Sequence, residues 1–286
     1  MSAFFGSAPV QLALIVGTFV AAVSALVGVF TVLRRQSFAG HALADLGAVG
    51  GSAAFLLGIP QLVGFVGAGI LAAGLMELVG IRRVQGRDVA TGIVFGFGLG
   101  LTALFLYLDT QLAGTSNAAI SVLFGSLFVI DASILPLVIG LSIVACLVVV
   151  VFYRWMLVDS LDPDLAAVRG IPVRLTGILF LVALALAVEL SALTIGAVLS
   201  TALLIAPAAA ALRLTRRVGF AILIAVGIGV ASTWLGILIS FESFSWYAGA
   251  HSWPVSFCIV AVAFVAYLLS GIAIPLRARK RVASVL

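Results

Sequence analysis

Residues 133–154 read SILPLVIGLSIVACLVVVVFYR, an apolar run with no charged residue before it ends at Arg154. A helix of roughly 20 apolar residues is long enough to cross the hydrocarbon core of a bilayer. Similar runs predict further spans at 9–33, 37–58, 61–81, 90–108, 175–191, 193–212, 218–240 and 255–275. The sequence therefore predicts an all-α transmembrane bundle with nine crossings. A version with eight crossings, in which the first span is short or peripheral, is the alternative.

The fifteen Lys and Arg residues fall in short clusters between these runs. The clusters are Arg34 and Arg35; Arg82, Arg83 and Arg87; Arg154, Arg169 and Arg174; Arg213, Arg216 and Arg217; and Arg277, Arg279, Lys280 and Arg281. Basic residues favour the cytoplasmic side of a membrane. If every cluster is cytoplasmic, the N-terminus lies outside and the C-terminus inside, and the outer loops 59–60, 109–117, 191–193 and 241–254 contain no Lys or Arg.

Composition also favours a membrane protein. The chain has 286 residues, of which 64% are hydrophobic and 9% charged, whereas a soluble domain carries about 25% charged residues. One transmembrane domain, residues 1–286, accounts for the whole length. The formal net charge of +5 is explained by cytoplasmic anchors, so no nucleic-acid partner is expected. Cys146 and Cys258 lie inside apolar runs, and a disulfide framework is not expected.

Two segments between the spans have special features. Segment 118–132 is apolar but too short for a separate crossing, and we interpret it as a short helix that dips into the outer half of the membrane. The alternative is an N-terminal extension of the next span. Segment 154–174 is the longest cytoplasmic connection; Asp162, Pro163 and Asp164 precede LAAV, and Gly170 follows it. This order predicts a brief helix with defined ends, which is either a docking site for a soluble partner or a capped connector.

Ionisable side chains inside predicted spans are candidate functional residues, because a charge is costly in the bilayer. His41 and Asp45 are four residues apart and share one helix face. Imidazole and carboxylate are ligands of Zn, Mn and Fe, and two weak ligands on a helix that lines a pathway could pass a divalent cation. The alternative is a His–Asp contact that only anchors the helix near its cytoplasmic end.

Three further residues have two interpretations each. Glu77 either belongs to a metal pathway or pairs with Arg82, about one turn later. Glu189 either lines the outer mouth or caps a turn. His251, in the outer loop, either meets an arriving metal or has no role.

Several catalytic and nucleotide-binding motifs are absent from the sequence. It contains no GxxxxGK[ST] segment, so the chain has no P-loop of its own for ATP. It also contains no HExxH and no cysteine-rich metal cage. Any energy source must therefore come from a partner or from an ion gradient, and no catalytic constellation with recognisable spacing appears in the sequence.

Five stretches together resemble the permeases of zinc, manganese and iron ABC importers. They are RRQSFAGHALADLGAVGGSAAFLLG (34–58), RRVQGRDVATGIVFGFGLGL (82–101), SVLFGSLFVID (121–131), DPDLAAVRGIPV (162–173) and LTIGAVLSTALLIAPAAAALRLTRR (193–217). They occur in the family's order, and the resemblance covers about residues 10–275. Pro207 matches the position of a span break in that family.

The resemblance implies a type II importer permease in the cytoplasmic membrane of a bacterium, which is a transport subunit and not an enzyme and has no cofactor of its own. It implies a homodimer around a central pathway, two cytoplasmic ATP-hydrolysing subunits and an extracytoplasmic metal-binding protein. His41 and Asp45 occupy the family's metal positions, although the second is more often His. The residues that match its ATPase-docking segment are Asp162, Pro163, Asp164, Ala166 and Gly170. A siderophore or cobalamin permease, or a gradient-driven secondary transporter, is the alternative function.

Overall fold

The chain forms a bundle of long helices. The computed structural model describes residues 2–79, 88–112, 117–125, 127–246 and 252–283, with side chains for 4–76, 96–112, 117–125, 127–246 and 252–272. Every regular element within these ranges is helical, as the sequence predicts. The elements are α1 (Ser2–Gly6), α2 (Ala8–Leu33), α3 (Ser37–Leu57), α4 (Gln61–Val79), α5 (Asp88–Leu112), α6 (Ala118–Phe124), η1 (Ala132–Ile134), α7 (Leu135–Val151), α8 (Tyr153–Leu161), α9 (Pro163–Val168), α10 (Val173–Ile195), α11 (Ala197–Leu214), α12 (Val218–Ser243) and α13 (Val255–Ala283).

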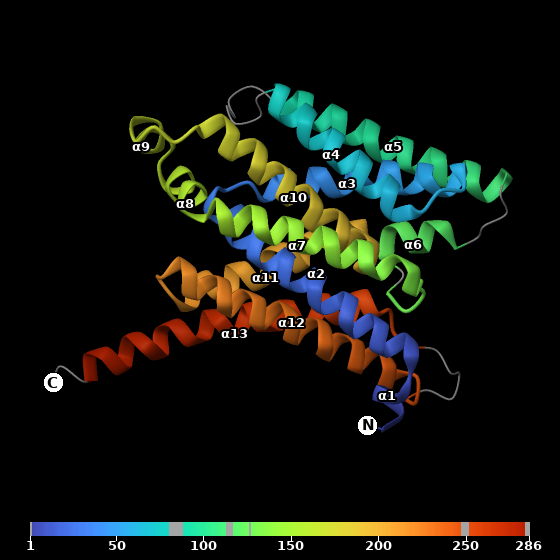
Figure 1. Ribbon diagram of the computed structural model, residues 1–286. Helices are drawn as coiled ribbons and strands as arrows, with labels where there is room; N and C mark the ends of the chain where they lie inside the picture. Colours follow the sequence, from blue (N-terminus) through green and yellow to red (C-terminus); the bar gives the residue numbers. More distant parts are fainter. Residues whose placement is uncertain (1, 80–87, 113–116, 126, 247–251, 284–286) are drawn as a thin grey trace.

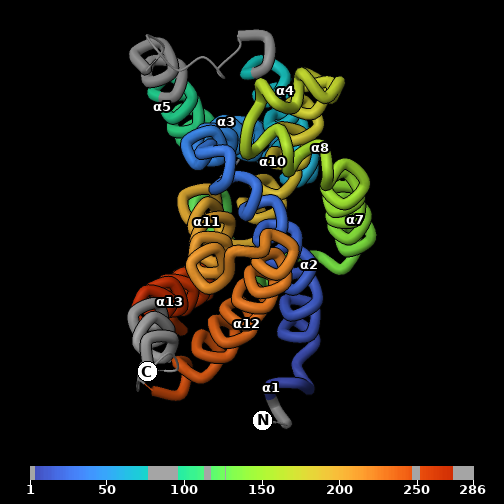
Figure 2. The backbone as a smooth tube through the Cα atoms, turned by 90° about the vertical axis from the view of Figure 1, so that its left-hand side faces the viewer, coloured from blue at the N-terminus to red at the C-terminus, as the bar shows by residue number. Residues whose placement is uncertain are grey.

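Helix α10 is the centre of the bundle. Every residue from position 183 to position 197 is buried, and α10 packs against α2, α3, α4, α7 and α11. The helices α3, α4 and α5 lie on one side of this centre, and α12 and α13 lie on the other (Figure 1; Figure 2). A helix that is apolar all round must be enclosed by others, which is why α10 occupies the middle.

Seven segments of the described chain are long and apolar enough to cross a membrane. They are Ala8–Leu33, Ser37–Leu57, Ala132–Val151, Val173–Ile195, Ala197–Leu214, Val218–Ser243 and Val255–Ile272. Each corresponds to a predicted span. In α4 the apolar helical stretch is shorter, Gln61–Met76. Exposed leucines on the outer helices, such as Leu147 on α7 and Leu223 on α12, are suited to contact with lipid. The count of nine crossings and the orientation of the termini stay predictions.

The helices α3 and α4 approach each other closely at a pair of glycines. A Cβ atom added to Gly50 would lie 2.1 Å from the Gly64 carbonyl oxygen, and one added to Gly64 would lie 2.2 Å from the Gly50 oxygen. Small residues at helix interfaces allow such contact between backbones in membrane proteins. The contact fixes α4 against α3, the helix that carries His41 and Asp45.

The predicted turn at 191–193 is wrong. Helix α10 continues to Ile195, and the break lies at Gly196, which has φ 90° and ψ 153°. The polar residues near the predicted turn make hydrogen bonds compatible with a helix: Ser191 Oγ lies 2.6 Å from Ser24 Oγ on α2, and the Thr194 hydroxyl donates to the Leu190 carbonyl at 3.2 Å. Pro207 lies inside α11, which runs without a break to Leu214.

A second break, at the end of α6, meets the Gly196 break. Helix α6 ends at Phe124, so it is shorter than the predicted 118–132 segment, and Gly125 follows with φ 82° and ψ 171°. A Cβ on Gly125 would lie 2.3 Å from the Thr194 carbonyl oxygen, and a Cβ on Gly196 would lie 2.2 Å from the Leu123 oxygen. The two backbone breaks are therefore packed directly against each other. The depth of α6 in the membrane stays a prediction.

The segment between α6 and α7 is fixed by a side-chain cap. The Ser133 backbone N–H donates to Asp131 Oδ1 at 2.8 Å at the start of η1. This hydrogen bond lowers the pKa of the exposed Asp131 carboxyl, because it stabilises the carboxylate form. Asp131 therefore carries its negative charge at neutral pH.

Candidate functional site

His41 and Asp45 lie one turn apart on α3, as their spacing predicts. His41 Nε2 is 3.8 Å from Asp45 Oδ2, which is too long for a direct hydrogen bond. The two side chains differ in exposure, at 44% for His41 and 8% for Asp45. The pair therefore runs from the surface of the chain into its interior, with the carboxylate at the inner end.

Glu189 on α10 is fully enclosed, and the described residues provide no hydrogen-bond partner for either of its carboxyl oxygens. Two glycines leave space for this side chain. A Cβ on Gly47 of α3 would lie 1.9 Å from Glu189 Oε2, and one on Gly69 of α4 would lie 2.5 Å from Oε1. Gly47 lies two residues after Asp45, so Glu189 packs against the segment of α3 that carries the Asp45 carboxyl. An acid on α10 and an acid on α3 are therefore neighbours inside the bundle.

A buried, unpaired carboxyl is costly unless a proton or a cation neutralises it. Among the described residues, neither Glu189 oxygen has a hydrogen-bond partner. Within the same ranges, no group of three His, Cys, Asp or Glu side chains could hold a metal ion. The sequence-predicted set is thus brought together in part: His41 lies beside Asp45, and Glu189 packs against the α3 segment that carries both. The side chain of Glu77 and the residue His251 lie outside the described residues.

The predicted docking segment consists of two short helices, α8 and α9. Asp162 Oδ1 accepts the backbone N–H groups of Asp164 and Leu165, each at 3.0 Å, and so caps the N-terminus of α9. Pro163 is the first residue of α9, where its missing N–H is not needed. Gly170, at φ 75°, follows the helix in the left-handed region. Ala166 is the buried residue of α9, so the other side chains of this helix are left at the surface.

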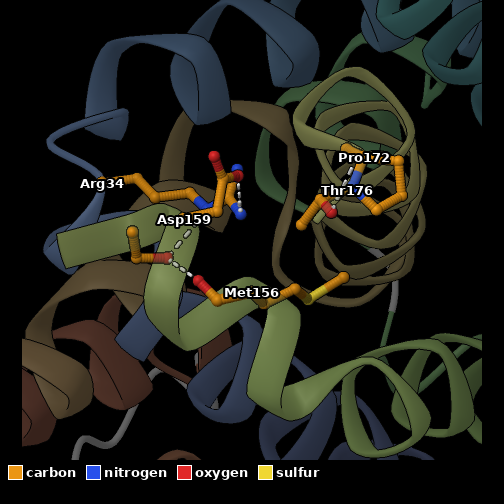
Figure 3. Close-up of polar contacts among 6 residues, drawn as sticks. Arg34, Met156, Asp159, Pro172 and Thr176 are labelled. Carbon is orange, nitrogen blue, oxygen red and sulfur yellow. Dashed lines mark hydrogen bonds and ion pairs between the residues drawn. The ribbon is translucent and has the colours of Figure 1, made fainter. Parts of the chain in front are cut away.

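A buried ion pair joins α8 to the end of α2 and was not predicted. Arg34 Nη2 lies 2.7 Å from Asp159 Oδ2, and Arg34 Nε donates to Ser160 Oγ at 3.0 Å. The Arg34 guanidinium also lies 4.5 Å from the centre of the Phe180 ring on α10. Figure 3 shows Arg34 and Asp159 facing each other close to Met156. One feature of the sequence points weakly to this pair. Asp159 lies in the 154–174 connection but before the residues that match the docking segment, which begin at Asp162.

A polytopic helical bundle with acids enclosed at its centre and short capped helices at one end has the architecture of a membrane transport permease. The chain belongs to the ABC 3 transport family, whose model matches residues 8–273.

Characterised relatives cover nearly the whole chain. The manganese transport system membrane protein MntC of Listeria innocua is 32% identical over 258 residues, which are 89% of this chain and 89% of the relative. The manganese import system permease protein ScaB of Streptococcus gordonii is 29% identical over 254 residues, 89% of this chain and 90% of the relative.

Two solved structures share the fold. PsaBC from Streptococcus pneumoniae in complex with Fab superposes with a TM-score of 0.80 at 26% identity and covers 94% of this chain and 93% of that chain. An inward-facing putative metal-chelate type ABC transporter gives a TM-score of 0.72 at 15% identity, with 92% and 85% covered. The second likeness concerns the fold alone.

Proposed function

We propose that the chain is the permease subunit of an ATP-driven importer of a divalent transition metal, with manganese favoured over zinc and iron. The observation that carries this proposal is the arrangement of His41 and Asp45 one turn apart on α3, with the enclosed Glu189 packed against Gly47 of the same helix. These are oxygen and nitrogen ligands, and carboxylates in particular suit Mn. The manganese permeases among the relatives support the same metal.

In this proposal two copies of the chain surround the pathway in the cytoplasmic membrane of a bacterium. Each copy crosses the membrane nine times, with its N-terminus outside. An extracytoplasmic metal-binding protein delivers the ion, and two cytoplasmic subunits bind and hydrolyse ATP against α8 and α9. The ion passes the His41/Asp45 face of α3 and leaves inside. Because a ligand shifts a conformational equilibrium only by its differential affinity for the two states, this face must differ in geometry between the outward-open and inward-open states.

Metal uptake tests the pathway. In cells that lack the native gene, His41→Ala and Asp45→Ala are each expected to reduce manganese uptake about tenfold or more, the effect of losing about 1.4 kcal/mol of favourable interaction. Uptake of radioactive manganese, zinc and iron at equal expression is the measurement. Ser52→Ala is the matched control, because Ser52 is also buried on α3 but its hydroxyl bonds only to the Val49 carbonyl of its own helix. Normal manganese uptake in both test variants would remove the assigned role.

The docking role of α9 has a separate test. Val168 is 86% exposed at the end of α9 although it is apolar, and Asp164 lies in the first turn of this helix. Val168→Asp and Asp164→Lys are expected to weaken binding of the ATP-hydrolysing subunits by about 1–3 kcal/mol each, the range for a contact near the centre of an interface. Co-purification and ATP hydrolysis by the complex measure this. Asp131→Lys, another charge reversal at an exposed capping region, is the control. Assembly at wild-type levels with both α9 variants contradicts the assignment.

A further inference from the structure

We propose that Arg34 is a positioning residue, which transmits the movement of the docking helices α8 and α9 to the two helices that carry the metal pathway. This inference rests on the proposed function, because it assumes that α9 is where the ATP-hydrolysing subunits bind. It goes further by naming the side chain through which their movement reaches Asp45 on α3 and Glu189 on α10.

The first link joins Arg34 to α8. The Arg34 and Asp159 side chains are 6% and 3% exposed, so their 2.7 Å ion pair is shielded from water. The second hydrogen bond, from Arg34 Nε to Ser160 Oγ, fixes the orientation of the guanidinium. The Ser160 hydroxyl also bonds to the Met156 carbonyl of its own helix. Such a charge-assisted pair in a low-dielectric surrounding is strong and directional, so α8 cannot move without moving Arg34.

The second link joins α8 to α9. Asp162, the residue that caps α9, is also the residue that ends α8. Its backbone N–H bonds to the Val158 carbonyl of α8, and its side chain holds the first N–H groups of α9. Asp159 and Ser160 therefore lie within one turn of the junction. A displacement of α9 by a bound subunit acts on these residues directly.

The third link joins Arg34 to α3. Arg34 ends α2, and only Arg35 and Gln36 precede the start of α3 at Ser37. This connection is held by backbone hydrogen bonds, from the Arg35 N–H to the Val32 carbonyl at 3.1 Å and from the Gln36 N–H to the Thr31 carbonyl at 2.9 Å. Because the turn is short and bonded, movement of the Arg34 backbone is passed to α3, where Asp45 follows two turns later.

The fourth link joins Arg34 to α10. Its guanidinium stacks on Phe180, which is fully buried, and Glu189 lies farther along the same helix. The planar Arg34 side chain thus contacts both α8 and α10, and the Arg34 backbone forms the C-terminal end of α2. Lysine cannot replace it, because an ammonium lacks the plane that stacks on a ring and the fork that bonds to two acceptors. Arg34→Lys keeps the charge and removes the geometry, and this makes it the informative variant.

The test measures coupling in the assembled complex. The permease and its ATP-hydrolysing subunits are placed in lipid vesicles, and manganese uptake and ATP hydrolysis are measured in the same sample. For Arg34→Lys we expect the manganese transported per ATP to fall at least about fivefold, the lower end of coupling effects between sites, while ATP hydrolysis continues. Asp159→Asn and Phe180→Leu remove single links and are expected to give smaller losses of the same kind. The double variant R34K/D159N is expected to lose little more than R34K alone, because both changes break one contact.

Arg213→Lys is the matched control. Arg213 also stacks on an aromatic ring, with its guanidinium 3.9 Å from the centre of Tyr267, but its partners lie on α13 and not on α8 or α9. It is expected to leave transport per ATP unchanged. A structural readout accompanies the assay: spin labels at positions 175 and 57, both exposed in the wild-type chain and both outside the docking segment, report the ATP-driven change in distance between the start of α10 and the far end of α3. Arg34→Lys is expected to remove this change.

Two results overturn the inference. In the first, Arg34→Lys transports the wild-type amount of manganese per ATP. In the second, uptake and hydrolysis fall in proportion, which means that Arg34 only maintains the fold or the assembly. Failure of the underlying function is distinguishable, because in that case the wild-type vesicles themselves take up no metal. If Arg34→Lys does not accumulate, Phe180→Leu, which retains the ion pair, decides between the same outcomes.

Discussion

Replacing Glu189 by leucine is expected to abolish metal uptake and at the same time to make the protein more stable. The carboxyl group is fully buried, and no described residue offers either oxygen a hydrogen bond. An unsatisfied buried polar group costs about 1–3 kcal/mol, and leucine, of similar size, removes that cost within the space left by Gly47 and Gly69. A gain of 1 kcal/mol corresponds to roughly 2–4 °C in Tm for a chain of this order of length.

The two effects are measured separately, by thermal unfolding in detergent and by manganese uptake in cells. Glu189→Gln keeps the shape but not the charge and is expected to lose uptake as well. Thr194→Val is the matched control, since Thr194 is buried on α10 and its hydroxyl bonds only to carbonyls of its own helix. Normal manganese transport by the leucine variant would mean that Glu189 has no role in the pathway. A marked loss of stability in that variant would mean that the Glu189 carboxyl is stabilised by partners in the folded protein.

Replacing Gly196 by alanine is expected to cause a large loss of stability. Gly196 is one of the two glycines, with Gly125, at which the packed helix breaks meet. At φ 90° and ψ 153° the residue occupies a region that is essentially restricted to glycine, and occupation by another residue costs about 1–3 kcal/mol. The new methyl group would also lie 2.2 Å from the Leu123 carbonyl oxygen. This overlap with the α6 backbone is expected to push α6 away from the break between α10 and α11. Gly125→Ala is expected to act in the same way, from the other side of the contact.

Expression level and thermal unfolding measure the loss. Gly58→Ala is the comparison variant, because Gly58 has φ 66° and ψ 25°, in the left-handed helical region, and nothing lies within 4 Å of an added Cβ. Alanine is strained less there than at φ 90° and ψ 153°, and it overlaps no backbone. G196A is therefore expected to lower Tm more than G58A, and an equal or smaller loss would contradict this prediction. The double variant G125A/G196A is expected to be less than additive, because both changes disrupt one shared contact.

Much of the fold could be predicted because the signals are local. Apolar length located the seven segments that can cross a membrane, and the Asp162–Pro163 and Gly170 signals located both ends of α9. The turn predicted at 191–193 is wrong because the basic residues Arg174 and Arg213 require an outer connection between them but do not fix its position along the apolar run. Ser191 and Thr194 lie inside helix α10. Their hydroxyls are satisfied by Ser24 on α2 and by their own helix, and only the first of these partners depends on the tertiary fold.

The candidate site shows the same division. The closeness of His41 and Asp45 follows from a spacing of four residues in any helix, so the sequence was sufficient for it. Nothing in the sequence brings Glu189 to Asp45, because their approach requires α3, α4 and α10 to meet at Gly47 and Gly69. The Arg34–Asp159 pair could not be predicted for a related reason: clusters of arginine between apolar runs are ordinarily solvated anchors, and this arginine is buried.

By itself the sequence determined the membrane environment, the all-helical class, the approximate helix limits and the capped helix α9. Each of these depends on hydrophobicity or hydrogen bonding within a few residues along the chain, so the local sequence contains the whole cause. Only the tertiary structure decided that α10 is central, that the breaks at Gly125 and Gly196 pack together, that Glu189 is enclosed beside Asp45 and that Arg34 joins α2, α8 and α10. These features arise from the choice of which helices pack against each other, and that choice rests on the shapes of surfaces built by residues far apart in the chain.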